Sequence, residues 1–254
     1  MRLFDTHAHL LSERFDQDRD ALIRRLPEMG IVGMIEVGCT VADSREALNL
    51  AQETDYIYAA IGVHPHEAAQ AGPDYIERLE ALAAHPKAVA IGEIGLDYHY
   101  DFSPRDVQKK VFERQMELAQ RLELPVAIHM REATQDVLAI LREHKGIKGV
   151  MHCFSGSPET AEICVNMGLC VSFTGSVTFK NARKVVEAAA VVPIDRLMAE
   201  TDCPYLSPEP VRGRRNDPAN VRHVIEKLAE IKGIPADEMA AINIRNAKEL
   251  YAIT

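Results

Sequence analysis

The sequence predicts an α/β protein, a (β/α)₈ (TIM) barrel that occupies residues 1–254 as a single domain. Eight short apolar, β-branched runs recur along the chain, and segments with helix start and stop signals separate them. Near-continuous apolar character over about four to eight residues is typical of parallel strands buried on both faces. Eight strand–helix units in about 250 residues fit a closed barrel better than the alternative, an open α/β sheet.

The eight predicted strands are short and evenly distributed along the chain. In order, they are Arg2–Asp5, Val32–Val37, Ile57–Ile61, Ala88–Ile91, Pro125–Ile128, Gly149–Met151, Cys170–Phe173 and Leu197–Ala199. The first strand is not followed by G-x-G-x-x-G, and the chain contains no Walker A sequence. Open sheets that bind nucleotides through these glycine-rich loops therefore lose their main support.

Several helix boundaries can be predicted from local residue chemistry. Ser103, Ser157 and Asp217 each precede a proline, which is the pattern of an N-cap followed by proline at the first helical position. Gly30 and Gly168 follow helical segments, where a residue in the left-handed conformation commonly ends a helix. These signals place helices between the predicted strands, as the barrel requires.

Composition limits the class of protein. The chain is 47% hydrophobic and 26% charged, which is ordinary for a globular protein. No segment approaches the roughly 20 apolar residues that span a bilayer. The first predicted strand begins at Arg2, which leaves no room for a signal segment, so we expect a cytoplasmic protein with no membrane association.

Charge and cysteine content exclude two further classes. The formal net charge of −9 argues against a protein that coats nucleic acid through a broad basic surface, although a few arginines could still hold one phosphate. The five cysteines form no Cys-x-x-Cys pair, and a chain of this size does not need disulfides, so we expect reduced thiols.

Side chains that bind metals follow five of the apolar runs. They are His7, His9, Glu93, His129, His152 and Asp202. In a barrel the carboxyl ends of the strands meet at one rim, where barrel enzymes place their chemistry. Taken singly, each histidine is more often a hydrogen-bonded core residue, and Glu93 could be an acid bonded to loop amides. Their shared position at strand ends instead predicts one metal site.

Six ligands exceed the needs of one tetrahedral ion and suit two ions bridged by a carboxylate. Glu93 is the expected bridge, because its strand lies between those that supply the other ligands. We expect the first ion to bind the histidine pair of the first strand together with Asp202, and the second to bind His129 and His152. Imidazole ligands favour zinc, manganese, cobalt or nickel, and the carboxylates leave magnesium possible.

Six ordered motifs resemble the successive signatures of the TatD family of metal-dependent deoxyribonucleases. They are DTHAHL, GVHPHEA, GEIGLDYHYD, PVAIHMREA, MHCFSG and ETDCPYLSPEPVRGRRNDP. The resemblance implies an amidohydrolase-like barrel that hydrolyses bonds with the help of metals, often DNA phosphodiester bonds. It also places the family's metal ligands on the six residues given above, with Glu93 as the bridge. Many barrel relatives use a carbamylated lysine there, whereas this chain has no lysine between Val89 and Asp97.

The expected chemistry is attack of an activated water on phosphorus, with the two ions neutralising the phosphate oxygens. Asp202 is expected to act as both ligand and proton acceptor, and Glu93 as the catalytic bridge. Arg131 could pair with a phosphate oxygen or form a salt bridge at a helix start. The resemblance places His66 beside the metals, where it is a candidate substrate contact.

Two loops carry further candidate substrate contacts. The long segment after the eighth strand contains Arg212, Arg214, Arg215 and Asn216, of which Arg212 and Asn216 are the expected contacts, although a basic run is usually a solvated surface. The loop after the fourth strand contains three aromatic residues that either stack on a terminal base or cover the barrel mouth. These are Tyr98, Tyr100 and Phe102.

The leading hypothesis is hydrolysis of DNA from single-stranded ends, with DNA as substrate and no obligate protein partner. The same metals could instead hydrolyse an ester, amide or lactone, including the ester of a mischarged aminoacyl-tRNA. A third reading is a non-catalytic metal-binding protein, which would lack an open coordination position. The ligands alone do not separate these functions, and the basic loop mildly favours a nucleic acid.

Overall fold

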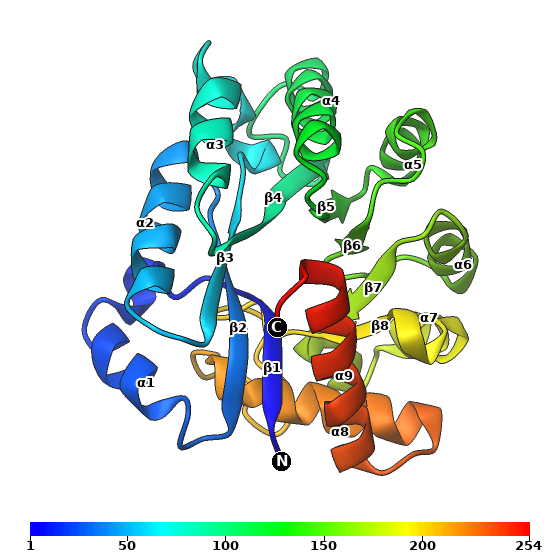
Figure 1. Ribbon diagram of the computed structural model, residues 1–254. Helices are drawn as coiled ribbons and strands as arrows, with labels where there is room; N and C mark the ends of the chain where they lie inside the picture. Colours follow the sequence, from blue (N-terminus) through cyan, green and yellow to red (C-terminus); the bar gives the residue numbers. More distant parts are fainter.

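Eight parallel strands form one sheet in the order β1 to β8, and the helices lie around its outside (Figure 1). The computed structural model describes residues 1–254. The strands are β1 (Leu3–Ala8), β2 (Ile31–Val37), β3 (Ile57–Ile61), β4 (Ala88–Asp97), β5 (Val126–Arg131), β6 (Gly149–Met151), β7 (Cys170–Phe173) and β8 (Leu197–Ala199). This arrangement confirms the predicted (β/α)₈ barrel.

Helices connect successive strands, as right-handed crossovers between parallel strands require. They are α1 (Arg19–Arg25), α2 (Val41–Gln52), α3 (Tyr75–Ala83), α4 (Arg105–Leu122), α5 (Thr134–Glu143), α6 (Pro158–Asn166), α7 (Arg183–Val191), α8 (Val221–Lys232) and α9 (Ala236–Tyr251). The last two follow the long loop after β8, and α9 packs against both β1 and β8.

Three strands run further than the sequence predicts. β1 continues to Ala8, β4 to Asp97 and β5 to Arg131. The predicted strands ended with their apolar runs, but residues beyond those runs also pair with the neighbouring strand, as His129 does with Gly95. His7, Glu93 and His129 consequently lie within strands rather than in the loops that follow them, whereas His9 lies just after β1.

Most of the predicted helix boundaries agree with the structure. The Ser157 side chain accepts a hydrogen bond from the Thr160 amide and caps α6. Asp217 caps a 3-10 turn, Pro218–Asn220, that leads into α8. Gly168 follows Met167, the C-cap of α6, and its φ of 94° lies in the left-handed region that favours glycine. Gly30 also has a positive φ, 98°, but it lies beyond Leu26, the C-cap of α1, so it does not end that helix.

The predicted role of Ser103 as an N-cap is wrong. Helix α4 begins at Arg105, so Pro104 occupies the capping position and Ser103 lies one residue earlier. The Ser103 hydroxyl donates to the backbone oxygen of His66 and accepts from the amide of Ala69. Ser103 therefore joins two loops at the barrel rim instead of capping a helix.

The barrel closes between β1 and β8 with little direct strand pairing. One isolated bridge joins Ala8 to Cys203, beyond the end of β8. Asn243 of α9 spans the gap below it: its side-chain oxygen accepts from the amide of Ala199, and its side-chain nitrogen donates to the carbonyl of Phe4, each at 2.8 Å. A helix side chain thus satisfies backbone groups that a regular ladder would pair.

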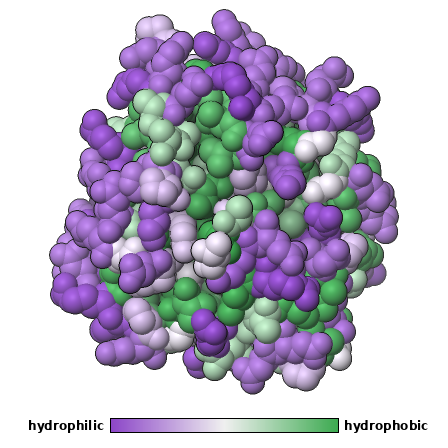
Figure 2. All heavy atoms as spheres, viewed as in Figure 1, coloured by the Kyte–Doolittle hydropathy of each residue, from purple (hydrophilic) through white to green (hydrophobic).

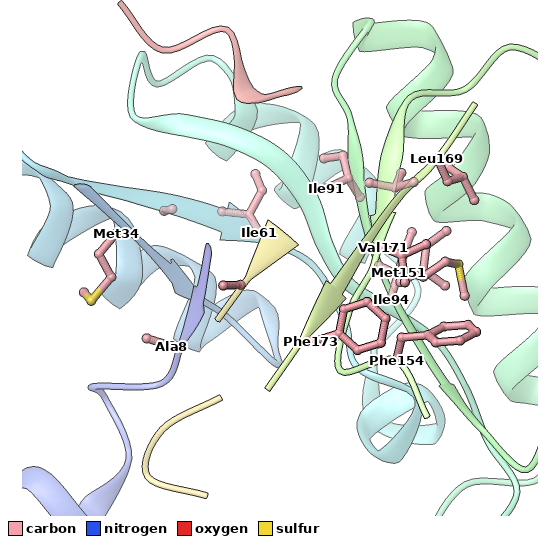
Figure 3. Packing of buried hydrophobic residues seen from close by; sticks show 14 of the residues in the cluster. Ala8, Met34, Ile61, Ile91, Ile94, Met151, Phe154, Leu169, Val171 and Phe173 are labelled. Carbon is pink, nitrogen blue, oxygen red and sulfur yellow. The ribbon is translucent and has the colours of Figure 1, made fainter. Parts of the chain in front are cut away.

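The core forms two clusters. The larger contains 60 buried residues, and Figure 3 shows part of it, including the edge-to-face contact of Phe154 with Phe173. The smaller contains 12 buried residues, includes at least one from every strand, and is completed by Tyr251 of α9. Because side chains alternate across a strand, the second cluster fills the barrel interior while most of the first lies between sheet and helices.

The face of the molecule that Figure 2 shows is polar around its edge. Figure 2 shows hydrophilic side chains over the peripheral helices, with hydrophobic atoms visible between them. No helix combines the length and the apolar character needed to cross a membrane.

Candidate metal centre

The structure brings the six predicted ligands together at the carboxyl ends of the strands. Glu93 lies at their middle and is 3% exposed. Its Oε2 atom is 3.4 Å from Nε2 of His7 and 3.7 Å from Nε2 of His9. Its Oε1 atom is 2.8 Å from Nδ1 of His129 and 3.3 Å from Nε2 of His152. Each carboxylate oxygen therefore faces a different pair of histidines.

The first group of donors joins the two sides of the barrel closure. Nε2 atoms of His7 and His9 lie 3.1 Å apart, and Oδ1 of Asp202 is 3.4 Å from the His9 nitrogen. The Asp202 amide donates to the backbone oxygen of His7, which fixes the loop after β8 against β1. Nδ1 of His9 is 3.1 Å from the carbonyl of Val37. A proton on Nδ1 leaves Nε2 of His9 free to coordinate a cation.

The second group of donors is supported by buried carboxylates. Oδ2 of Asp97 lies 3.0 Å from Nε2 of His129, so Nδ1 of that ring is directed toward Glu93. Oε1 of Glu200 lies 2.8 Å from Nδ1 of His152, so Nε2 of that ring faces the site. A carboxylate behind a histidine fixes its tautomer and raises its basicity as a ligand.

The charges in the site favour a cation. Burial disfavours ionised Glu93, but the surrounding His64 and His152 lower the pKa of Glu93 well below its usual value. Burial opposes ionisation of Asp202 as well, and the hydrogen bond from His9 holds its pKa below the ordinary value. Both carboxylates are therefore anionic at neutral pH and concentrate negative charge among the histidine nitrogens.

The histidines respond in opposite directions to this environment. Burial lowers the pKa of His7, whose ring stacks on that of His152 with centroids 3.6 Å apart. Burial also disfavours charge on His152, but Glu200 and Glu93 outweigh it and raise the pKa of His152 to about 9. Without a bound cation, His152 therefore holds a proton that a metal ion would have to displace.

His64 is a further site residue that the sequence did not assign. Its Nε2 atom is 3.5 Å from Oε1 of Glu93, and its Nδ1 atom accepts a hydrogen bond from the amide of His66. Burial lowers the pKa of His64 to about 4, so the ring is neutral and its proton lies on Nε2. His64 thus presents a hydrogen-bond donor to the site rather than a lone pair for a metal.

Asp97 and Glu200 were also not assigned a role from the sequence. Asp97 follows Glu93 by four residues within one strand, and Glu200 precedes Asp202 by two. Both are fully buried, and an acid in an apolar strand has to be paired to remain ionised. That spacing was the available signal, but it does not reveal which histidine each acid would support.

The predicted substrate contacts His66 and Arg131 differ in whether a carboxylate of the protein already pairs with them. Nε2 of His66 is 3.0 Å from Oδ2 of Asp97, the same atom that supports His129. Arg131 has no carboxylate within salt-bridge distance, and its guanidinium lies 4.7 Å from the ring centroid of Tyr100. The alternative interpretation of Arg131, a salt bridge at a helix start, is therefore not observed.

The loop after β8 divides its polar residues between structure and surface. Arg215 donates two hydrogen bonds to Asp18, and the buried side chain of Asn216 bonds backbone oxygens of Thr201 and Tyr205. The guanidinium of Arg212 lies over the ring of Phe179 and has no acidic partner. This geometry gives Asn216 a role in holding the loop, and a substrate contact for Asn216 remains a prediction that the geometry does not favour.

Clusters of ligand atoms show that the residues suit a metal. Five groups of three donors have their ligand atoms within 4.8 Å of one another, and they share the residues already described, together with Cys39 and Cys153. Buried imidazoles facing ionised carboxylates form the donor set that divalent transition metals prefer. The barrel and this rim together define a metal-dependent hydrolase.

Comparison with known proteins identifies the family. The model of the TatD related DNase family matches residues 4–252, and the chain belongs to that family. It is 46% identical over 253 residues to the uncharacterized metal-dependent hydrolase YabD of Bacillus subtilis, covering 99% of each chain. It is 37% identical to the 3'-5' ssDNA/RNA exonuclease TatD of Erwinia tasmaniensis, covering 98% of this chain and 99% of the relative.

A solved structure supports the same conclusion. The TatD homologue YjjV of Escherichia coli K12 superimposes with a TM-score of 0.93 at 30% sequence identity, covering 100% of this chain and 99% of that one. The sequence-based resemblance to the TatD family is thereby confirmed, as is the prediction that the protein is a hydrolase.

Proposed function

We propose that the protein hydrolyses phosphodiester bonds of DNA from single-stranded ends, using two divalent ions, with residues 1–254 acting as one catalytic domain. The observation that carries the proposal is the position of Glu93, whose two carboxylate oxygens face two separate histidine groups. Relatives named as single-stranded DNA and RNA exonucleases support a nucleic-acid substrate.

The first ion would be held by His7, His9 and Asp202, and the second by His129 and His152, with Glu93 shared between them. The donors support zinc, manganese, cobalt, nickel or magnesium. When bound, such ions lower the pKa of water and neutralise charge on phosphate oxygens. The carboxylate of Glu93 would keep the two groups in fixed relation, because it is buried and contacts histidines from both.

Asp202 would accept the proton released by the attacking water. Its carboxylate is ionised, lies at the rim, and has a side chain that is 15% exposed, so it can reach both ligands and solvent. His64 would direct its Nε2 proton toward the same space and could donate to a phosphate oxygen. Arg131 and Arg212, with no acidic partners, would attract the strand's phosphates.

The principal test supplies each divalent metal to the metal-free protein and measures cleavage of single-stranded DNA, duplex DNA, RNA and a panel of esters, amides and lactones. We expect cleavage of single-stranded DNA to be fastest. His129→Ala should abolish it while Glu113→Gln, an exposed change on α4, should not. Hydrolysis of an ester such as an aminoacyl-tRNA without any phosphodiesterase activity would overturn the proposal.

The role of Asp202 can be tested separately. Asp202→Asn removes the proton acceptor but keeps an oxygen that can bind a metal, so we expect turnover to fall at least a hundredfold. Metal content, measured on the same preparation, distinguishes loss of the base from loss of the ion. Full metal occupancy with a near-normal rate would show that another group accepts the proton.

Two exposed arginines of the loop after β8, Arg212 and Arg214, predict that DNA binding depends on salt. If Arg212 and Arg214 contact phosphates, binding of single-stranded DNA weakens as salt rises, with a slope of about −0.7 per phosphate contact. The double substitution to alanine should reduce that slope by more than one. Arg215→Ala is a poor control because Arg215 pairs with Asp18. Arg142→Ala, an exposed change in the last turn of α5, serves instead.

A further inference from the structure

The loop between β4 and α4 presents an aromatic surface beside the metal centre. Phe102 is 67% exposed and Tyr100 is 48% exposed. Their rings stack with centroids 5.2 Å apart and planes inclined by 22°. The only other exposed aromatic residue in the chain, Tyr205, lies at the same rim, in the loop after β8. Exposed aromatic residues are therefore confined to the end of the barrel that carries the metal ligands.

The stack is joined to the metal centre through His66. The His66 ring makes an edge-to-face contact with Phe102, with centroids 4.8 Å apart. Nε2 of His66 shares Oδ2 of Asp97 with His129, and the His66 and His129 ring centroids are 6.3 Å apart. One histidine thus separates the exposed ring from a proposed metal ligand, so that a bound group could touch both.

The structure separates the three aromatic residues of this loop into two roles. The hydroxyl of Tyr98 donates to Asp136, and Arg105 lies 4.2 Å from its ring centroid. Both the hydroxyl and the ring of Tyr98 consequently have partners within the protein. Tyr100 has Arg131 at 4.7 Å and Phe102 stacked on it, which leaves Phe102 as the most exposed ring of the series.

The loop is held in shape before any ligand arrives. Oδ1 of Asp97 accepts from the amides of His99 and Tyr100, and the side chain of Gln108 donates to the carbonyl of Ser103. Arg105 pairs with Asp101 across the same turn. A surface fixed in this way loses little conformational entropy on binding, which favours a function in recognition.

We infer that Phe102, supported by Tyr100, stacks against the base of the terminal nucleotide whose phosphate lies at the metal centre, with Arg131 holding the neighbouring phosphate. A nucleobase fits this surface because both of its faces are flat π-systems and its attached phosphate is anionic. Stacking accepts every base, so the platform sets a preference for unpaired ends and not for a sequence. The inference rests on the proposed nuclease function and specifies how that site recognises its substrate.

The experiment combines a protein change with a substrate change. The probes are single-stranded DNA oligonucleotides with a normal terminal nucleotide and matched strands with an abasic terminal nucleotide, prepared for both ends. Wild type, Phe102→Ala, Phe102→Tyr and Ile163→Ala are compared by KM and kcat with the same metal. Ile163, exposed on α6, provides an apolar truncation away from the rim.

We expect Phe102→Ala to raise KM about tenfold for the normal strand, because one stacked base contributes that much to affinity. Phe102→Tyr and Ile163→Ala should keep KM within about twofold. The abasic end should weaken binding to wild type by a similar factor but should have no further effect in Phe102→Ala, since the two changes remove one contact.

Two results would overturn the inference, and they differ from each other. In the first, wild type cleaves DNA, but Phe102→Ala retains the wild-type KM and the full penalty for the abasic end. This result would contradict base stacking on Phe102 and leave the nuclease function intact. Wild type that cleaves no nucleic acid with any metal would remove the nuclease function first. Unchanged thermal unfolding of Phe102→Ala checks that the exposed substitution leaves the fold intact.

Discussion

The two halves of the candidate metal centre are supported differently. The half formed by β1 and β8 is backed by a neutral group, the carbonyl of Val37 behind His9. The half formed by β5 and β6 is backed by ionised groups, Asp97 behind His129 and Glu200 behind His152. A carboxylate behind a histidine makes it a stronger ligand than a carbonyl does. We therefore expect His129 and His152 each to bind a cation more tightly than His9 does.

The largest effect should come from the residue that both halves share. Glu93→Gln keeps the size of the side chain but removes the one charge that faces both histidine groups. We expect loss of both ions and a fall in turnover of at least a thousandfold. Metal content and activity measured together, with Glu113→Gln as the matched surface control, give the answer. Retention of one ion would show that one half binds without the bridge.

The next effect should fall on one half only. Asp97→Asn and Glu200→Gln remove the charges behind His129 and His152, and the second ion's affinity should drop about 10- to 100-fold in each variant. The first ion should be held nearly as well as in wild type. Calorimetric metal titration resolves the two binding steps. Equal weakening of both steps would mean that the halves are not independently supported.

The half formed by β5 and β6 also predicts how the stability of the metal-free protein depends on pH. The pKa of His152 is about 9 in the folded protein and about 6.5 in the unfolded chain, so the protonated ring stabilises the fold. This stabilisation is complete below about pH 6.5 and is lost as the pH rises through about 9. Between those limits we expect the unfolding midpoint of the metal-free protein to fall by a few degrees. The fall should shrink once a metal replaces the proton. A midpoint that rises across this range would contradict the assignment.

The smallest effect should come from the first half. Cys39 lies within ligand distance of His9 and Glu93, but burial raises the pKa of its thiol, which therefore stays protonated at neutral pH. A protonated thiol is a weak ligand, so Cys39→Ser should change metal affinity by less than about threefold. A large loss, measured by the same calorimetric titration, would show that a thiolate belongs to the first half.

Most of the architecture could be predicted from the sequence. Side chains at the ends of apolar runs, such as His9 and Asp202, lie together because parallel strands present their carboxyl ends at one rim. Their role as metal ligands stays a prediction. Strand lengths were underestimated where polar residues continue the ladder, as after Ile91 in β4. A pattern based on apolar runs does not distinguish a loop from a strand whose inward side chains are ligands.

Other features depend on packing that a single sequence does not specify. Asp97 could be recognised as a buried acid, but its double contact with His66 and His129 follows from three separate strands and loops meeting. The donor role of His64 depends on one backbone amide, that of His66, which sets the ring's tautomer. The Ser103 hydroxyl likewise found a partner in another loop, where local propensity favoured a cap.

Asn243 and the Ala8–Cys203 bridge span the gap between β1 and β8. Because of this gap, the proposed first ion would also affect the stability of the barrel. His7 and His9 lie on one side of that gap and Asp202 on the other. An ion bound by all three would therefore cross-link the beginning of the chain to residue 202. A cross-link across a long chain segment restricts the unfolded ensemble strongly. The cation would thus stabilise the closure of the barrel. Without it, we expect the barrel to unfold first between β1 and β8.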